Sequence, residues 1–492
     1  MSSAFNPNPS EFNYDAVVNN DRTIPSNLRF SNLTPMGLVS TAKKFIFRPT
    51  NQNVFSENNN VIQIPIASST SVIDPQLTYF KFTLENKDAA NDMQIDNCID
   101  TIIAGFRLFS RNGGVDAETL RYYNQLIAIL YDTEFNAWKR HSLKTIQGFG
   151  NGLSVVNSTV NITVPAIPAA IPAGGIAAAN VVGNTTSNLN SSRLGTGELV
   201  LAHGEKHTFC MPFLSSLIGL LQTKYFLTSL MGHCDLEIVL NPNFYISSAN
   251  AKIPWEVSGF EMHCQLISFQ DPIIERLKAV AATTGIYIHG QQWSGYKEAI
   301  SANTNTIVIS ERLRSVNNVL LAFSKDRTDY RIRQQARKSN RLSSLQLKIG
   351  DNLYPSQPIR GEGGGGTRDI GGVVTDVEGK LADNSEFLCE YYKSMCLLHN
   401  VNNCGIIDGY NFAYNDDSKF NHDRVGRAVY GIEISSFSKP ENPIECGIDL
   451  NANGPLNIMF TSNEGTQCYA YVFMNYDVVY SILQDGRFVV AK

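Results

Sequence analysis

The sequence predicts an all-β protein built from two tandem β-sandwiches, and three observations lead to this prediction. Most segments alternate apolar and polar residues with the period of two that is typical of half-buried strands, as in residues 61–66 and 77–84. Helix-like segments are few, short and widely spaced. The chain has 492 residues, which is too many for one ordinary hydrophobic core, and each half combines a series of short strands with one long loop.

The N-terminal residues 1–45 are expected to form an extended arm, because they are rich in Asn, Pro and Ser and show no sustained period. Up to position 42 the arm has three acidic and two basic residues, which sum to −1 (Glu11, Asp15, Asp21, Arg22 and Arg29). The first sandwich is expected over residues 46–300. A Pro-, Ala- and Gly-rich insertion at residues 161–198 is expected to form a surface loop within it.

Three segments of the first half are predicted to contain helices. Residues 116–132 are the strongest candidate, because Asp116 can cap the free amides and apolar residues recur at helical spacing (Leu120, Tyr123, Ile127, Leu130 and Tyr131). The compact apolar run 212–226 leads into a strand, and residues 271–282 begin with a proline, which the first turn tolerates. A strand over residues 285–293 is expected to close this half.

The second sandwich is expected over residues 301–492. Its strand-like segments are residues 306–313, 315–323, 342–350, 430–437, 454–462 and 468–483. A Gly- and Asp-rich insertion at residues 360–425 is expected to be a second long loop, and residues 484–486 a hairpin turn near the end of the chain.

The composition argues against several classes of function. Charged residues make up 17% of the chain and the net charge is −5, whereas a protein that holds nucleic acid by its phosphates needs clustered Lys and Arg. The 9 cysteines include no C-x-x-C pair, so we expect reduced, buried thiols. Because we find neither a signal peptide nor about 18 consecutive apolar residues, we expect synthesis in a reducing compartment without a secretory signal, and no transmembrane segment.

Possible ligand motifs favour ordinary structure. The residues Asp449, Asn451, Asn453 and Gly454 match the front half of a calcium loop, but Phe460 stands where a bidentate Glu is required. An Asx-type turn is therefore the favoured interpretation.

A Gly-rich stretch and a histidine pair are also expected to bind no ligand. Residues 361–372 fail as a phosphate-binding loop because Lys380 is followed by Leu381, and a mobile loop is favoured. The histidines at 203 and 207 have i, i+4 spacing but lie in a strand–turn–strand pattern, so they share no helical face. No catalytic, cofactor-binding or metal-binding residue is therefore assigned, and no cofactor is expected.

The basic cluster of the sequence lies in the second half (Arg327, Arg331, Arg333, Arg337, Lys338 and Arg341). Asp326 and Asp329 dilute its charge. A solvated loop or a salt-bridge patch between subunits is favoured over contact with phosphates or acidic lipid. We expect no sequence-specific binding of nucleic acid.

The order of several landmarks points to a known family. The run FRLFSRNGGVDAETLRYYNQLIAIL is followed by CMPFLSSLIGLLQTKYFLTSLMGHCDLEIVLNP, then SVNNVLLAF and LQLKIGDNLYPSQPI, and finally GIEISSFSKPENPIECGIDLNANGPLNIMF and YDVVYSILQDGRFVV. In this order and spacing they resemble the double jelly-roll major capsid proteins of small eukaryotic double-stranded DNA viruses, of the Polinton-like virus, adintovirus and virophage type. The resemblance covers most of residues 60–490, and the two insertions fall where the family carries variable outward loops.

The resemblance implies a fold and a structural role. The fold would be two tandem eight-stranded jelly rolls with short helices and long surface loops. The chain would be a virion protein without enzymatic activity, forming homotrimeric, pseudo-hexagonal capsomers that tile an icosahedral shell. Its partners would be neighbouring capsomers together with penton and minor capsid proteins. In this role we expect the arm to order against neighbouring subunits through four aromatic anchors (Phe5, Phe12, Tyr14 and Phe30).

Two other classes of protein remain as alternatives. A β-sandwich that binds or hydrolyses glycans would need clustered carboxylates and exposed tryptophans, and the chain has only 3 Trp and no obvious acid pair. A coat protein of a single-stranded RNA virus commonly carries an Arg-rich arm, which this sequence lacks. Both alternatives are disfavoured on these grounds.

Overall fold

A computed structural model describes residues 40–492, apart from short internal stretches and one long one. The residues outside the description are 1–39, 68–70, 112–113, 151–197, 248, 270, 302–303, 326–328, 362–367, 371–372, 376–383, 399–404, 408–411, 413–425, 436–446, 463–466 and 484–486. The predicted arm anchors Phe5, Phe12, Tyr14 and Phe30 therefore lie outside the described residues. So do nearly all of the first insertion and most of the second.

The first half of the chain forms two antiparallel sheets that face each other, each with four main strands. One sheet has the order β1-β12-β4-β9, with bounds Ser40–Phe47, Trp255–Phe269, Val72–Asn86 and Lys206–Pro212. The other has the order β3-β10-β6-β7, with bounds Val61–Ile66, Cys234–Leu240, Ile103–Ser110 and Val115–Arg121. The short strand β2 (Val54–Phe55) also pairs with β12.

The second half repeats this arrangement. One sheet has the order β13-β22-β15-β20, with bounds Ile286–Ile300, Cys468–Ile482, Val316–Ser324 and Tyr430–Glu433. The other has the order β14-β21-β16-β17, with bounds Thr306–Ile309, Leu456–Ser462, Leu342–Ile349 and Asn352–Arg360. The last strand, β23 (Phe488–Ala491), pairs antiparallel with β22, and the turn expected at residues 484–486 lies outside the described residues.

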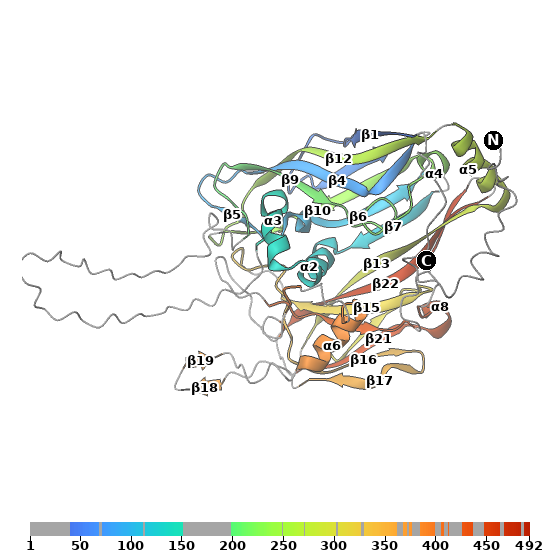
Figure 1. Cartoon of the computed structure of the whole chain (residues 1–492). Helices are drawn as coiled ribbons and strands as arrows, with labels where there is room; N and C mark the ends of the chain where they lie inside the picture. The colour runs from blue at the N-terminus through green and yellow to red at the C-terminus, as the bar shows by residue number, and fades with distance from the viewer. Residues whose placement is uncertain are drawn as a thin grey trace, which may run out of the picture. The chain divides into compact units, whose positions relative to one another are not determined.

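The strand order shows that both halves are jelly rolls. If the eight main strands of either half are counted along the chain, one sheet holds the first, eighth, third and sixth, and the other holds the second, seventh, fourth and fifth. Two consecutive Greek keys produce this order. The prediction of two tandem eight-stranded jelly rolls is confirmed, and Figure 1 shows both rolls with their accessory helices.

The remaining elements connect and flank the rolls. A small sheet joins β5, β8 and β11, with bounds Met93–Ile95, Val200–Leu201 and Tyr245–Ser247, and a second pairs β18 with β19, with bounds Arg368–Ile370 and Val373–Thr375. The helices are η2, α2, α3, α4, α5, α6 and α8, with bounds Ile99–Ile102, Tyr123–Glu134, Ala137–Gln147, Thr228–Met231, Asp271–Thr284, Ser385–Ser394 and Leu450–Asn453. Within the described residues, none of these helices is long and apolar enough to cross a membrane.

The strands form because one face of each is apolar. In β10 every second residue is buried, from Cys234 to Leu240, and in β3 the buried residues alternate in the same way. Their register places Ile64 opposite Leu236 and Ile62 opposite Ile238, so the buried sets meet on one face of the sheet. The same alternation that identified these segments in the sequence therefore builds the sandwich core.

The predicted helix over residues 116–132 is only half correct. Residues Val115–Arg121 form strand β7, and helix α2 begins at Tyr123. The two are separated by Tyr122, whose left-handed backbone (φ 59°) ends the strand, and Asp116 therefore caps no helix. Pairing with β6 satisfies backbone groups along one edge of residues 115–121, and this tertiary contact overrides the local helical spacing.

Three other expectations differ in their outcome. Residues 212–226 contain no α-helix: after β9 the chain makes turns in which Ser215 Oγ accepts the N–H groups of Leu217 and Ile218. The helix expected over residues 271–282 is present as α5. The strand expected over residues 285–293 corresponds to the start of β13, which pairs with β22 and so belongs to the second roll instead of closing the first.

Candidate functional site

The two rolls meet along strands β7 and β13. These strands lie against each other, and β23 also contacts β7. At Gly295 of β13 the backbones come so close that a Cβ atom would lie 2.3 Å from the carbonyl oxygen of Arg121. Only glycine fits there without a shift of one backbone. The junction is therefore a close contact between backbones as well as between side chains.

A buried ionic cluster at the junction is centred on Asp132 of α2. Arginines from three parts of the chain donate to its carboxylate: Arg140 at 2.5 Å, Arg337 at 2.6 Å and Arg427 at 2.5 Å. The side chains of all four residues are at most 6% exposed. Burial alone would raise the pKa of Asp132, but Arg427, Arg337 and Arg140 outweigh it and hold this pKa well below its ordinary value. The charged carboxylate thus joins α2 and α3 of the first roll to two segments of the second.

A second ionic pair lies between the rolls at Arg333. Both of its terminal nitrogens donate to Glu198, at 2.8 Å each, and one lies 3.6 Å from Asp96. Asp96 also accepts the backbone N–H groups of Gln334 and Gln335, at 2.7 and 3.0 Å. Burial opposes ionisation of Glu198, but Arg333 lowers the pKa of this carboxyl below its ordinary value. This bidentate pair fixes the segment before β16 on the first roll.

A third buried network connects Glu118 of β7 to the second roll. Glu118 accepts hydrogen bonds from Ser215 Oγ at 2.5 Å and from Ser216 N at 2.9 Å. The hydroxyl of Ser216 is hydrogen-bonded to that of Tyr480 in β22, and Gln292 Nε2 donates to Tyr480 Oη at 2.7 Å. Burial raises the pKa of Glu118 to about 7, against the opposing effect of the two serines.

Another buried acid lies inside the first roll. Asp100 accepts hydrogen bonds from Tyr131 Oη at 2.9 Å and Gln147 Nε2 at 3.1 Å. Burial raises the pKa of Asp100 to about 7. These buried acids have hydrogen-bonding or ionic partners that hold helices and strands together, and none of the contacts described forms a catalytic pair.

The basic cluster of the sequence is not a solvated loop. Arg333, Arg337 and Lys338 are buried, and Arg333 and Arg337 form ion pairs between the two rolls of one chain. Arg331, by contrast, forms an exposed pair of the expected kind with Asp329. Arg327 lies outside the described residues. The expectation of a solvated or intersubunit patch is therefore wrong for Arg333 and Arg337.

The smaller motifs match their predicted structure in the part of the chain that is described. Asp449 Oδ1 accepts the N–H groups of Asn451 and Ala452, which is the expected Asx-type turn at the start of α8. His203 and His207 share no partner: one lies 3.8 Å from Asp92 and the other bonds Thr145 O at 2.8 Å. No group of three or more potential metal ligands occurs among the described residues.

None of the described cysteines forms a disulfide, but not all of them are buried. Cys98, Cys234, Cys264 and Cys468 are buried as expected. Cys389 in the middle of α6 and Cys396 just after its end are exposed, so the expectation of uniformly buried thiols is wrong for these two.

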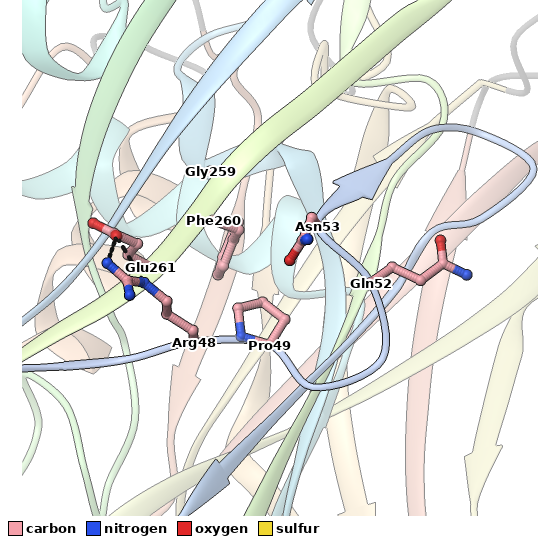
Figure 2. Close-up of a pocket in the computed structure, with 7 residues that line it drawn as sticks. All are labelled: Arg48, Pro49, Gln52, Asn53, Gly259, Phe260 and Glu261. Carbon is pink, nitrogen blue, oxygen red and sulfur yellow. Dashed lines mark hydrogen bonds and ion pairs between the residues drawn. The ribbon is translucent and has the colours of Figure 1, made fainter.

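The sheet β1-β12-β4-β9 presents two hollows beside β1. The larger, about 400 Å³, is lined by Lys44 of β1, by Leu77 and Tyr79 of β4 and by His263 of β12. The smaller, about 150 Å³, lies where the chain leaves β1, and Figure 2 shows Arg48 paired with Glu261 beside Pro49 and Phe260.

Comparison with solved structures reveals a similar fold in virus proteins. PBCV-1 VP54, as fitted into a reconstruction of the virophage Sputnik, has a TM-score of 0.53 at 10% identity and covers 94% of this chain and 99% of that one. The chain of the PBCV-1 capsid model gives the same values. The major capsid protein of faustovirus has a TM-score of 0.52 at 8% identity, covering 94% of each chain.

The chain has the double jelly-roll fold. The similarity spans both rolls, because the coverage includes nearly the full length of each chain. No family model and no curated protein sequence matches this double jelly-roll chain. Its likeness to the capsid proteins therefore lies in the arrangement of its strands.

The sequence alone identifies few of the residues that hold the double jelly roll together. Arg333 and Arg337 are visible as basic residues, but their acidic partners are 135 and 205 positions away. Their sequence neighbours are mostly polar (Gln334, Gln335, Lys338, Ser339 and Asn340), so no local apolar pattern marks these two arginines as buried.

Proposed function

We propose that this protein is the major capsid protein of a double-stranded DNA virus. It forms homotrimeric, pseudo-hexagonal capsomers that tile an icosahedral shell, and it has no enzymatic activity. The observation that carries the proposal is the double jelly roll itself, which extends along the chain as in PBCV-1 VP54 and the faustovirus major capsid protein. The buried ion pairs between the rolls support it, because a subunit that tiles a lattice needs a fixed relation between its parts.

The partners in this proposal are other virion proteins. Each capsomer contacts neighbouring capsomers, and penton and minor capsid proteins complete the shell. The proposed organisation is an arm that ends before β1 at Ser40, a first roll, and a second roll that begins with β13, because this strand pairs with β22. The insertions 161–198 and 360–425 lie on the outer side. The protein acts in the virion, after synthesis in the host cell.

Light scattering on the purified full-length protein tests the proposed oligomer. We expect a particle of three times the 54.4 kDa chain mass, since only three copies of a two-roll chain give six rolls around one axis. Electron microscopy should show objects with a roughly six-fold outline. A stable monomer at micromolar concentration would argue against the proposal.

Deleting the arm should affect assembly more than folding. We propose that Phe5, Phe12, Tyr14 and Phe30 anchor it on neighbouring subunits at the inner side of the shell, because its low charge cannot hold it on DNA phosphates. Strand β1 begins at Ser40, so removal of residues 2–39 leaves that strand intact.

The truncated protein should stay folded and trimeric but give far fewer closed particles in an assembly assay. The variant with all four aromatic anchors changed to Ser is the matched control, because it keeps the length and charge of the arm. Normal particle yield from both variants would contradict an assembly role for the arm, and release of the arm by salt alone would indicate electrostatic anchoring instead.

The glycan-binding or glycan-hydrolysing alternative gains no support from the described residues. Trp255 and Trp293 are buried in the rolls, and Trp138 is exposed by itself on α3. The buried carboxylates bind arginines and hydroxyls instead of facing an open cleft. We therefore propose no second function.

A further inference from the structure

The two rolls contact each other through one strand from each roll. Within the described residues, the equivalent strands on the other sides of the two rolls make no such contact. Strand β7 is the fifth main strand of the first roll and lies against β13, the first main strand of the second. By the same count, the counterpart of β13 in the first roll is β1, and the counterpart of β7 in the second roll is β17. Each chain therefore contains one contact of this kind, between β7 and β13, and leaves β1 and β17 without the equivalent contact.

The exposure of the strands reflects this difference. Of the seven residues in β7 only Arg121 is exposed, whereas β17 exposes five of nine, among them Leu353 at 41%. In β1 all of residues 40–45 are exposed, on both faces of the strand, and Phe45 is 44% exposed. A strand that is uncovered on both faces and carries a large apolar side chain favours contact with another surface.

The space beside β1 also differs from the space beside β13. Where the first roll covers β13, Gln292 Nε2 reaches the carbonyl oxygen of Ala117 at 2.8 Å, and Tyr122 stacks edge-on against Tyr471. The side chains of β1 have no second roll of the same chain beside them. The hollow of about 400 Å³ lies next to β1, and Leu77, which is 51% exposed, lines it. This exposed, partly apolar surface could bury the apolar residues of β17.

We propose that β17 of one copy packs against β1 and the adjoining hollow of a second copy, and so repeats between chains the β7–β13 contact made within each chain. The occupant is a second copy of this chain because the internal contact already shows that these two strand types fit together. The interface is heterologous, since each copy gives β17 to one neighbour and β1 to another, and three such contacts can close a ring. The inference rests on the proposed capsomer and names its contact surfaces.

Cysteine cross-linking in the full-length protein tests the proximity of the two strands. Ala42→Cys lies in β1 and Gln357→Cys in β17, both at exposed or half-exposed positions. Mixing the two single variants under mild oxidation should give covalent dimers, and the double variant should give covalently closed trimers. The matched control pairs Gln357→Cys with Thr145→Cys, an exposed position on α3, and the parent protein measures the background from Cys389 and Cys396.

A charge placed in the interface should separate the copies. Leu353→Asp should raise the trimer dissociation constant at least about tenfold in light scattering, because it puts a carboxylate where an apolar side chain is buried. Val308→Asp is the matched control: Val308 is 51% exposed in the same cross-strand row as Leu353, but on the opposite edge strand β14.

The outcomes separate this inference from the proposed function. A trimeric parent protein that neither cross-links between positions 42 and 357 nor responds to Leu353→Asp would overturn the interface and leave the capsomer intact. A monomeric parent protein would overturn both. Cross-linking at this pair, together with dissociation by Leu353→Asp and not by Val308→Asp, would support the interface.

Discussion

Replacement of Asp132 by Asn should destabilise the protein by about 3–5 kcal/mol, the usual cost of removing one partner from a buried ion pair. The substitution keeps the shape of the side chain but removes the negative charge that Arg140, Arg337 and Arg427 share. Each guanidinium then remains buried without its carboxylate. Because these arginines come from both rolls, the loss should weaken the junction as well as the first roll.

Denaturant unfolding of the full-length variant, followed by circular dichroism, measures this effect. The matched control is Asp235→Asn, which removes a carboxylate that accepts hydrogen bonds from Arg111 at 2.5 and 2.9 Å on the surface. Surface pairs contribute about 0–1 kcal/mol, so this control should unfold near the midpoint of the parent protein. Similar midpoints for both variants would show that Asp132 does not hold the junction.

Much of the fold follows from the period of the strands. Residues 315–323, 342–350 and 468–483 are identified by alternation or by dense β-branched and aromatic content, and they correspond closely to β15, β16 and β22. The jelly-roll order itself depends on which strands pair, and pairing is a long-range property that no single segment encodes. Here the resemblance of the landmarks supplied what the local pattern could not.

The errors share one physical cause. The apolar side chains of residues 115–121 have a spacing that suits a helix. These residues form a strand instead, because their backbone pairs with β6. Residues 212–226 form an apolar run that resembles a buried helix. They form turns instead, in which Ser215 and Ser216 donate hydrogen bonds to Glu118. In both places a tertiary partner decides the local structure. The ionic junction is likewise invisible in a local window, because Arg337 and Asp132 are 205 positions apart.

Replacement of Glu118 by Gln should change how the stability of the protein depends on pH. Burial raises the pKa of Glu118 from 4.5 to about 7, so the folded state holds a proton that the unfolded state releases at a lower pH. The associated stability is complete below pH 4.5 and is lost as the pH rises through about 7. The shift corresponds to about 3 kcal/mol. The amide introduced by the substitution would be neutral at every pH and keep a similar shape.

The difference in unfolding free energy between the parent protein and Glu118→Gln should therefore shift by about 3 kcal/mol between pH 4.5 and pH 8. The parent should lose stability relative to the variant as the pH rises. Asp100 titrates in the same range because burial raises its pKa to about 7, but it is present in both proteins and cancels in the difference. Asp132 does not interfere, since its depressed pKa confines its effect to pH values below 3.8. A difference that stays constant over this range would mean that Glu118 remains charged in the junction, and that Ser215, Ser216 and Lys492 compensate for its burial.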